Sequence, residues 1–400
     1  MRILLAANAS YAPPRGGATR SNLIWLNQFA RAGHQCHVIA GASKEGAELP
    51  LHRSITVSAI AQPAARVEAL RRAAREFAPD WVLISSEDLG HALLREARHS
   101  APGRVVYLAH TPQFFPFGRE SWNPDRHAAQ AAVEAAGVVT IGAHMAGYVS
   151  AELGRAAAVI HPPIYGKGPF PACADFDRGL VTMFNPCAVK GISLFAAAAR
   201  RLPHCAFAAV PGWGTTAEDR RTLDPLPNVR LLPNAREIDD ILSRTRVLLV
   251  PSLWHEGYGL IVTEAMLRGI PVVASDAGGL PEAKRGTGYV IPVKTIERYQ
   301  PVFDELRMPR PVLPSNDVAP WVEALAELTR DRSAWERESA ASREAAAAFV
   351  AGLDAGDMEA WLQALHPVSE ARGEAATIES LTPEKRDLLL RRLRRRKMCT

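Results

Sequence analysis

Short apolar runs alternate with helical patterns along this 400-residue chain, and the alternation occurs in two successive series. The runs are almost continuously apolar, as expected of parallel strands that helices cover on both faces. Alternating strands and helices form βαβ units, which assemble into doubly wound sheets. The first series predicts strands at residues 3–7, 37–40, 81–85, 105–109, 138–141 and 158–160. The second series predicts strands at residues 181–184, 206–210, 229–232, 247–250, 272–274 and 289–291.

The two series predict two α/β domains, and the chain is long enough for both, since one domain takes ~100–200 residues. We expect residues 1–165 to form a first Rossmann-like domain and residues 166–350 a second, facing each other across a cleft. Ligands of such sheets bind at the carboxyl ends of the strands. Residues 351–366 are expected to form a helix that crosses back to the first domain. Residues 367–400 are interpreted as a linker and a basic tail helix.

Composition excludes several other classes of protein. The sequence has no run of eighteen apolar residues, so we predict no membrane-spanning helix. The apolar run at the N-terminus is too short for a signal peptide and is interpreted as a strand. The five cysteines form no Cys-x-x-Cys pair, which argues against a disulfide framework or a zinc site. These features predict a cytoplasmic location.

The positive charge is concentrated at the C-terminus. The formal net charge is +5, but residues 381–400 hold eight basic and two acidic residues, or +6, which leaves −1 for the other 380. A nucleic-acid partner is therefore not predicted, because the body of the chain is not basic. The tail is either a solvated basic helix or an amphipathic helix that rests on anionic lipid through residues 381–397. The second alternative would place the protein peripherally at the inner face of the membrane.

The most informative segment is residues 250–282, VPSLWHEGYGLIVTEAMLRGIPVVASDAGGLPE. A predicted strand ends in a loop that holds Glu256, a Gly-Tyr-Gly-Leu turn follows at 257–260, and a predicted helix contains Glu264. Small residues at a strand-to-helix turn let backbone N–H groups approach an anion, and the helix N-terminus adds its dipole. Two carboxylates at such a turn are well placed to accept hydrogen bonds from sugar hydroxyls. The segment thus predicts a phosphate-and-sugar site.

This segment resembles family 4 of the glycosyltransferases, which are retaining enzymes of the GT-B fold. The signature of that family is two glutamates separated by seven residues, matched by Glu256 and Glu264, then EAM-x-x-G-x-PVVAS. A Gly-Gly…Glu turn follows, matched by Gly278, Gly279 and Glu282. The resemblance implies the GT-B fold, with two Rossmann-like domains facing a cleft.

Three further positions resemble the same family. Gly16 and Gly17 resemble its N-terminal Gly-Gly loop, and Lys190 stands where the family has a phosphate-binding lysine. His110, after a predicted strand, stands where the family has a histidine facing the donor sugar; the alternative is a structural histidine. One position departs from the pattern, because the family has arginine where this chain has Asn185, five residues before the lysine.

The resemblance implies a nucleotide-diphospho-sugar donor of the UDP or GDP type, with no other cofactor and no metal. Glu264 would hold the ribose hydroxyls, Glu256 would contact sugar hydroxyls, and Lys190 would neutralise the departing pyrophosphate. A donor phosphate oxygen would take the acceptor's proton. The implied catalytic residues are His110, Lys190 and Glu256. The implied donor-binding residues are Gly16, Gly17, Asn185, Lys190, Glu256, Gly257, Tyr258, Gly259, Leu260 and Glu264.

Asn185 predicts a weakened phosphate site, since asparagine lacks the charge and the bidentate fork of arginine. Arg15 and Arg236 are candidates for a compensating cation. Cys187 lies close in sequence to the predicted phosphate lysine, but a buried, inert thiol is the preferred interpretation. Asp175-Phe176-Asp177 is interpreted as a solvated loop, not a metal site.

An aromatic loop after residue 109 is a candidate wall for the acceptor, since ligand pockets are mostly apolar. The alternative is packing beneath a long loop. The candidate acceptor residues are Phe114, Phe115, Phe117 and Trp122. The acceptor could be a glycan, a lipid or a natural-product aglycone, and Phe114, Phe115 and Phe117 favour an apolar one.

The tail offers one more resemblance. Residues 381–389, LTPEKRDLL, resemble a linker motif of non-ribosomal peptide and polyketide synthase assembly lines, which would imply docking to a synthase and natural-product biosynthesis. The predicted function is retaining sugar transfer from a nucleotide sugar to an acceptor hydroxyl. Two alternatives are a non-catalytic nucleotide-sugar-binding scaffold and a sugar-nucleotide epimerase of the same architecture.

Overall fold

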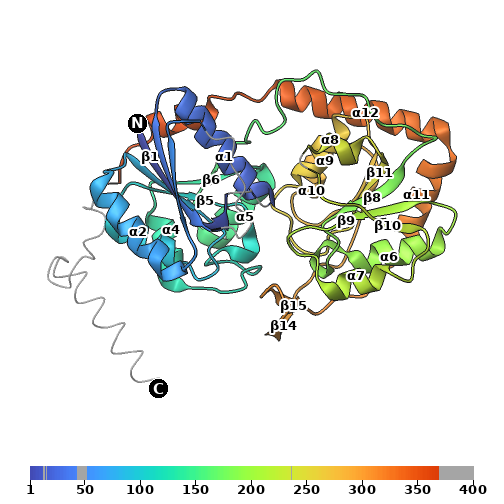
Figure 1. Ribbon diagram of the computed structural model, residues 1–400, viewed down its shortest axis with the longest axis horizontal. Helices are drawn as coiled ribbons and strands as arrows, with labels where there is room; N and C mark the ends of the chain where they lie inside the picture. Colours follow the sequence, from blue (N-terminus) through green and yellow to red (C-terminus); the bar gives the residue numbers. More distant parts are fainter. Residues whose placement is uncertain (12–13, 15, 43–51, 236, 369–400) are drawn as a thin grey trace, which may run out of the picture.

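The computed structural model describes residues 1–11, 14, 16–42, 52–235 and 237–368, which form two lobes side by side (Figure 1). The first lobe, here the first domain, holds a parallel sheet of strand order β3-β2-β1-β4-β5-β6-β7. Its strands are β1 (Arg2–Ser10), β2 (Gln35–Gly41), β3 (Ile55–Ile60), β4 (Trp81–Ser85), β5 (Val105–Leu108), β6 (Gly137–Thr140) and β7 (Ala158–Val159). Its helices are α1 (Gly16–Arg31), α2 (Pro63–Glu76), α3 (Ala92–Ser100), α4 (Arg126–Glu134) and α5 (Ala143–Leu153), with a 3₁₀ turn η1 (Pro112–Phe114).

Helices cover both faces of this sheet, as the continuous apolar strands predict. Leu4 of β1 belongs to the apolar cluster shared with α2, α3 and α4, whereas Ile3 and Leu5 belong to the cluster shared with α1. Successive side chains of a strand point to opposite faces, so an unbroken apolar run supplies both clusters at once.

The second domain repeats the same winding. Its parallel sheet has the order β10-β9-β8-β11-β12-β13, so that in both domains the strand order reverses beside the first strand of the series. The strands are β8 (Leu180–Phe184), β9 (Phe207–Val210), β10 (Val229–Leu231), β11 (Thr245–Val250), β12 (Val272–Ser275) and β13 (Val290–Ile291). The remaining elements are η2 (Ala188–Lys190), α6 (Ile192–Arg201), α7 (Ala217–Leu223), α8 (Asp239–Leu242), α9 (Leu260–Met266), α10 (Leu280–Lys284), α11 (Ala319–Arg330) and α12 (Arg332–Ala351).

Every strand predicted from the sequence is present, with ends that differ by up to three residues, whereas β3 and an antiparallel hairpin were not predicted. β3 is an edge strand whose side chains are mostly half-buried or exposed, so its sequence lacks a continuous apolar run. The hairpin consists of β14 (Tyr299–Phe303) and β15 (Pro309–Pro311) and forms a separate two-stranded sheet. Its side chains are largely exposed, so burial imposes no periodic pattern on them.

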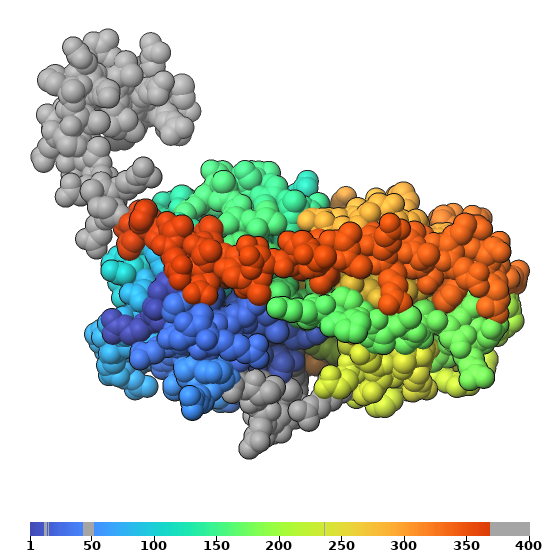
Figure 2. All heavy atoms as spheres, turned by 90° about the horizontal axis from the view of Figure 1, so that it is seen from above, coloured from blue at the N-terminus to red at the C-terminus, as the bar shows by residue number. Residues whose placement is uncertain are grey.

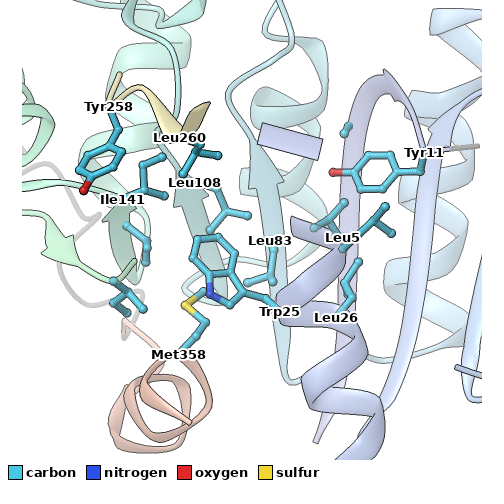
Figure 3. Close-up of a cluster of buried hydrophobic side chains, with 14 of the residues drawn as sticks. Leu5, Tyr11, Trp25, Leu26, Leu83, Leu108, Ile141, Tyr258, Leu260 and Met358 are labelled. Carbon is cyan, nitrogen blue, oxygen red and sulfur yellow. The ribbon is translucent and has the colours of Figure 1, made fainter. Parts of the chain in front are cut away.

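The C-terminal helices run along one face of the molecule and over both domains (Figure 2). α12 packs against the second domain, and α13 (Asp357–Ala364) packs against the first. Met358 and Leu362 of α13 are each 1% exposed and lie in the same apolar cluster as Trp25 of α1 (Figure 3). His34 Nε2 and Glu359 Oε1, 2.9 Å apart, add a polar contact. The chain therefore returns to its first domain after completing the second.

The same apolar cluster joins the two domains directly. Tyr258 and Leu260 of the second domain lie in one cluster with Leu108 and Ile141 of the first, as Figure 3 shows. Because this contact is apolar and continuous, it brings the carboxyl ends of the two sheets together.

A carboxylate from the second domain also caps a helix of the first. Glu282 accepts hydrogen bonds from the backbone N–H groups of Ala143 (2.9 Å) and His144 (2.8 Å), at the start of α5. The N-cap of that helix is Gly142, which has no side chain to satisfy these donors. A Cβ at Gly142 would lie 3.0 Å from Glu282 Oε2, so the glycine leaves room for the carboxylate. The contact combines hydrogen bonds with a favourable dipole interaction.

No helix of the described residues is long and apolar enough to cross a bilayer. The predicted tail helix and its docking region, residues 381–397, lie outside the described residues.

We expect Leu362→Ala to lower the free energy of unfolding by about 2–4 kcal/mol, because it opens a cavity in the apolar cluster beneath α1. Thermal and denaturant unfolding measure this loss. The matched control is Gln363→Ala on the exposed side of the same helix, which should change stability little. Equal stability of both variants and the wild type would contradict the assigned packing of α13.

Candidate active site

A cavity of about 710 Å³ lies between the domains, where the carboxyl ends of both sheets meet. The first domain contributes residues at the ends of β1, β4 and β5, and the second contributes residues that follow β8, β9 and β11. This is the place where ligands bind in doubly wound folds. The predicted residues that line the cavity are Gly16, Gly17, His110, Phe114, Asn185, Lys190, Glu256, Gly257, Tyr258, Gly259, Leu260 and Glu264.

Glycines allow the two domains to approach closely at this point. A Cβ at Gly257 would lie 2.1 Å from the carbonyl oxygen of His110, so the backbones of the two domains touch here. Gly259 has φ of 103° and begins α9, a conformation that favours glycine. A Cβ at Gly17 would lie 3.0 Å from Leu260, so the N-terminus of α1 lies against the N-terminus of α9.

Lys190 and Glu256 are brought together at one side of the cavity. Lys190 Nζ lies 2.6 Å from Glu256 Oε1, and Ser252 Oγ donates a short hydrogen bond to the same oxygen. The ammonium group also lies over the ring of Trp254, 4.6 Å from its centroid. The two side chains are only 19% and 10% exposed, so their charges interact in a partly desolvated setting.

Glu264 forms an ion pair across the domains that the sequence did not suggest. Arg20 of α1 donates from Nη2 to Glu264 Oε1 at 2.8 Å, and the side chains are 39% and 5% exposed. The pairing depends on the packing of α1 against α9, and no local sequence motif indicates that these two helices are in contact. The sequence offered one indication that Arg20 could reach the site, namely its position in the helix that begins at the predicted Gly-Gly loop.

His110 is buried and neutral, and it donates one hydrogen bond while its other ring nitrogen is left as an acceptor. Its Nε2 lies 2.9 Å from Asn22 Oδ1, and the Asn22 amide donates to the Tyr11 hydroxyl at 2.8 Å. In this network Nε2 carries the proton and Nδ1 the lone pair. Burial lowers the pKa of His110 to about 4, which keeps the ring uncharged at neutral pH. Nδ1 has no partner among the described residues, although the side chain lines the cavity.

Glu87 is a cavity residue that the sequence interpretation missed. It follows β4, lines the cavity, and its Oε2 finds no hydrogen-bond partner in the described part of the chain. Burial raises its pKa to about 7. The sequence feature that could have identified it is the acidic pair Glu87-Asp88, which begins two residues after the buried strand β4 ends. Its neighbour Asp88 instead accepts a hydrogen bond from the backbone N–H of Leu93 (2.8 Å) in α3 and so has a structural role.

The backbone conformation and the hydrogen bonding of Asn185 are both compatible with an asparagine at this position of the second domain. It adopts a left-handed conformation with φ of 53°, which asparagine tolerates. Its Oδ1 accepts from the N–H of Gly214 at 2.9 Å, and a Cβ at Gly212 would come within 2.7 Å of that oxygen. Its Nδ2, like Nε1 of Trp254, has no partner among the residues described. Arg15 and Arg236, the predicted compensating cations, are not among these residues.

The polar atoms that have no partner among the described residues differ between the two walls of the cavity, although each wall also carries paired groups of the opposite kind, Glu256 and Glu264 on the second-domain wall and Arg20 on the first-domain wall. The second-domain wall offers hydrogen-bond donors, namely the Lys190 ammonium, Asn185 Nδ2 and Trp254 Nε1. The first-domain wall offers acceptors, His110 Nδ1 and the Glu87 carboxyl group. An anionic ligand group is favoured beside Lys190, Asn185 and Trp254, and ligand hydroxyl groups are favoured beside the carboxyl groups and His110 Nδ1.

Two predicted acceptor residues were wrong and a third does not reach the cavity. Phe115 and Phe117 are 0% and 6% exposed and pack in the core of the first domain with Tyr107. Trp122 packs on Trp254 and on Tyr299 of the hairpin. The short turn η1 directs this aromatic sequence inward, so the loop serves mainly as packing, and only Phe114 lines the cavity.

The predictions of a solvated loop at Asp175–Asp177 and of a buried thiol at Cys187 are confirmed. Asp175 and Asp177 are exposed in a loop, where Asp177 pairs with Arg332. Cys187 is 3% exposed, and burial raises the pKa of its thiol to about 12, so the thiol is unreactive at neutral pH. Within the described ranges, no three His, Cys, Asp or Glu residues gather in a group that could hold a metal ion.

Comparisons with known proteins agree with this geometry. The family model described as Glycosyltransferase Family 4 matches residues 15–165, and the model described as Glycosyl transferases group 1 matches residues 179–300. The two matches fall on the first and the second sheet in turn. Each part of the chain thus matches a glycosyltransferase model, and the two sheets have the GT-B arrangement, as predicted. No curated protein sequence matches it.

Solved structures share the fold at low sequence identity. Sucrose-phosphate synthase from Thermosynechococcus elongatus has a TM-score of 0.68 at 16% identity, covering 90% of this chain and 96% of that chain. HepE from Anabaena, in complex with UDP and glucose, has a TM-score of 0.64 at 16% identity, covering 91% and 100%. A TarM variant from S. aureus, in a complex that includes UDP, has a TM-score of 0.66 at 10% identity, covering 90% and 99%.

The raised pKa of Glu87 predicts a pH-dependent stability. A carboxyl group with a pKa of about 7 in the folded protein and 4.5 as the ordinary value binds more protons when folded, so stability falls as pH rises from 5 to 8. Glu87→Gln should remove this loss and stabilise the protein by about 2–3 kcal/mol at pH 8. At pH 5 the variant and the wild type should be equally stable.

Thermal unfolding at the two pH values measures the effect. The matched control is Glu76→Gln at an exposed position of α2 in the same domain, which should leave the pH dependence as in the wild type. A Glu87→Gln variant with the wild-type pH dependence would show that this carboxyl group ionises normally.

Proposed function

We propose that this protein is a retaining glycosyltransferase that moves a sugar from a nucleoside-diphosphate sugar to an acceptor hydroxyl. The observation that carries the proposal is the pairing of each motif glutamate with a cation at the interdomain cavity, Lys190 with Glu256 and Arg20 with Glu264. The two glycosyltransferase domains that enclose this cavity support it further.

The diphosphate is assigned to the second-domain wall near Lys190. That wall presents donors, and α6 begins at Ile192, two residues after Lys190, with its dipole adding positive potential. The N-terminus of α1, at Gly16 and Gly17, faces the same cavity from the other domain. Two structural neighbours are known in complexes with UDP, which favours a UDP-type donor.

The nucleoside and the sugar are assigned to the two glutamates. Glu264 is 4% exposed and would accept hydrogen bonds from the ribose hydroxyls, and Glu256 from hydroxyls of the transferred sugar. His110 Nδ1, neutral and unpartnered, would accept from another sugar hydroxyl on the first-domain side. The hydroxyl donors of the ligand then replace the cations that these carboxylates hold in the unliganded protein.

The chemistry assigned to the site is electrostatic. As the bond between the sugar carbon and the donor oxygen breaks, Lys190 and the helix N-termini stabilise the charge that develops on the diphosphate. The acceptor hydroxyl attacks from the face that the diphosphate leaves and passes its proton to the departing phosphate oxygen. Attack on that face retains the anomeric configuration. In this scheme neither a protein base nor a metal ion has a role.

The acceptor substrate is proposed to be largely apolar. Phe114 lines the cavity, and so does Met308, which directly precedes β15. The adjoining hairpin carries large exposed apolar side chains, Val302 (47%), Phe303 (65%) and Leu306 (43%). An apolar surface that continues from the cavity in this way favours a lipid or an aglycone over a bare glycan. Docking of the tail to a membrane or a synthase stays a prediction.

A non-catalytic scaffold is the second candidate, and Asn185 is the observation that favours it. A neutral side chain replaces an expected cation there, which weakens the electrostatic stabilisation on which transfer depends. A scaffold would bind the nucleotide sugar without any hydrolysis or transfer. An epimerase would instead change the donor sugar with no acceptor present.

Binding of the donor is tested by thermal shift with UDP, GDP, ADP and TDP and their common sugars. A ligand that binds only the native state adds ~2.7 kcal/mol at a hundredfold excess over its dissociation constant. We expect a shift with one nucleotide family. Glu264→Ala should abolish it, whereas Glu323→Ala at an exposed site of α11 should keep it. A screen without any shift would contradict the proposed donor site.

Catalysis is tested at Lys190. We expect Lys190→Ala to reduce donor hydrolysis and sugar transfer by roughly a hundredfold or more, since it removes the cation that faces the leaving group. The matched control is Lys294→Ala at an exposed position of the same domain, which should retain full activity. Product release is followed by chromatography, and the anomeric configuration by NMR. An unaltered rate in Lys190→Ala would remove the catalytic assignment.

A further inference from the structure

The cavity holds few cations for a site that is assigned to a diphosphate. Among its described lining residues, the permanently charged cations are Lys190 and Arg20, one from each domain. Three carboxyl groups line the same cavity, those of Glu87, Glu256 and Glu264. Each cation is already paired with a glutamate, at 2.6 Å for Lys190 and 2.8 Å for Arg20. A diphosphate that binds here therefore meets two cations that are each already paired with a glutamate.

Asn185 does not supply the missing charge. Its carbonyl oxygen is occupied by the N–H of Gly214, and its free Nδ2 offers neutral hydrogen bonds. A neutral donor binds phosphate more weakly than a guanidinium group, which presents a charged, planar fork. Among the described residues, a second cation for the diphosphate must therefore come from another side chain that lines the cavity.

We propose that Arg20 is this second cation, and that it moves from Glu264 to the diphosphate when the donor binds. The proposal rests on the proposed function and assigns to its donor site a residue of the opposite domain. The ribose hydroxyls donate to Glu264 in place of the guanidinium group, so the glutamate keeps its hydrogen bonds. The released Arg20 then pairs with a phosphate oxygen, so its charge stays compensated while Glu264 keeps hydrogen-bond donors.

The position of Arg20 on α1 supports this exchange. It lies four residues after Gly16, so the two residues share one face of the helix. That face meets the second domain, because a Cβ at Gly16 would lie 3.8 Å from Trp213. The guanidinium side chain is 39% exposed, in contrast to the 5% of its partner Glu264, and so has room to move. The backbone at the start of α1 and the guanidinium group of Arg20 thus line the same cavity.

The exchange links donor binding to the contact between the domains. Lys190 holds the diphosphate from the second domain and Arg20 holds it from the first, so the anion bridges the two. A nucleoside without phosphates engages Glu264 but does not give Arg20 a new partner. The loss of Arg20 should therefore weaken the binding of nucleoside diphosphates but not that of nucleosides.

The test compares UDP with uridine, and GDP with guanosine, on the full-length protein by isothermal titration calorimetry. Arg20→Ala should weaken binding of the diphosphate on the order of ten- to a hundredfold, because a charge-assisted contact is lost. Binding of the nucleoside should stay unchanged or become tighter, because Glu264 is free. Arg20→Lys keeps the charge without the fork and should fall between the wild type and Arg20→Ala.

Two variants complete the design. Arg31→Ala lies at the exposed end of the same helix and should bind both ligands as the wild type does. Arg20→Met keeps the apolar stem of the side chain and replaces Arg20→Ala should that variant fold poorly.

The outcomes separate this proposal from the proposed function. Equal losses for nucleoside and diphosphate, or no loss for either, would show that Arg20 only joins the domains, and would overturn the proposal while the donor site stands. A wild-type protein that binds none of the four ligands would overturn the donor site itself, and the role of Arg20 with it.

Discussion

The continuous apolar contact between the two domains is the interaction on which the site depends. Tyr258 and Leu260 pack in one cluster with Ile141 and Trp25, and α13 closes the cluster from the other side with Met358. Burial of apolar surface has no direction of its own, so polar contacts orient the two lobes. The Glu282 carboxylate at the start of α5 is one of these. Together they hold two sets of strand ends against one cavity.

Two ion pairs dominate the electrostatics at that cavity, and each joins a glutamate of the 250–282 segment to a cation. Lys190 holds Glu256, and Arg20 holds Glu264. Unpaired buried charges would be costly, so the unliganded protein compensates them internally. A ligand that brings both hydroxyl donors and a diphosphate can exchange with both pairs at once, which favours a nucleotide sugar over a simple phosphate or a simple sugar. The unpartnered atoms of His110, Asn185 and Trp254 fit the same division between hydroxyls and anion.

The predictions made from local patterns succeeded where burial imposes a pattern. Most strands of the two sheets are covered on both faces, so their sequences are almost continuously apolar and can be recognised. The hairpin of β14 and β15 is exposed, so its sequence has no such apolar pattern. The aromatic sequence at Phe115 and Phe117 was misassigned, because an apolar side chain in a loop has the same signature whether it faces a ligand or the core. Glu87 and Arg20 were missed, because a single charged residue carries no pattern until its surroundings are known.

The sequence by itself determined the two sheet domains, their order, and the loop, turn and helix that carry Glu256 and Glu264. Burial on both faces requires each strand to be an almost continuous apolar run, and the loop, turn and helix follow one another in the chain, so local composition and spacing are enough to predict these features. Only the tertiary structure decided which residues meet across the cavity, as in the pairing of Arg20 with Glu264, 244 positions apart. It also decided which of the four aromatic residues reaches the cavity. The physical reason is that ion pairing and burial depend on distances in space, which the packing of the two domains sets.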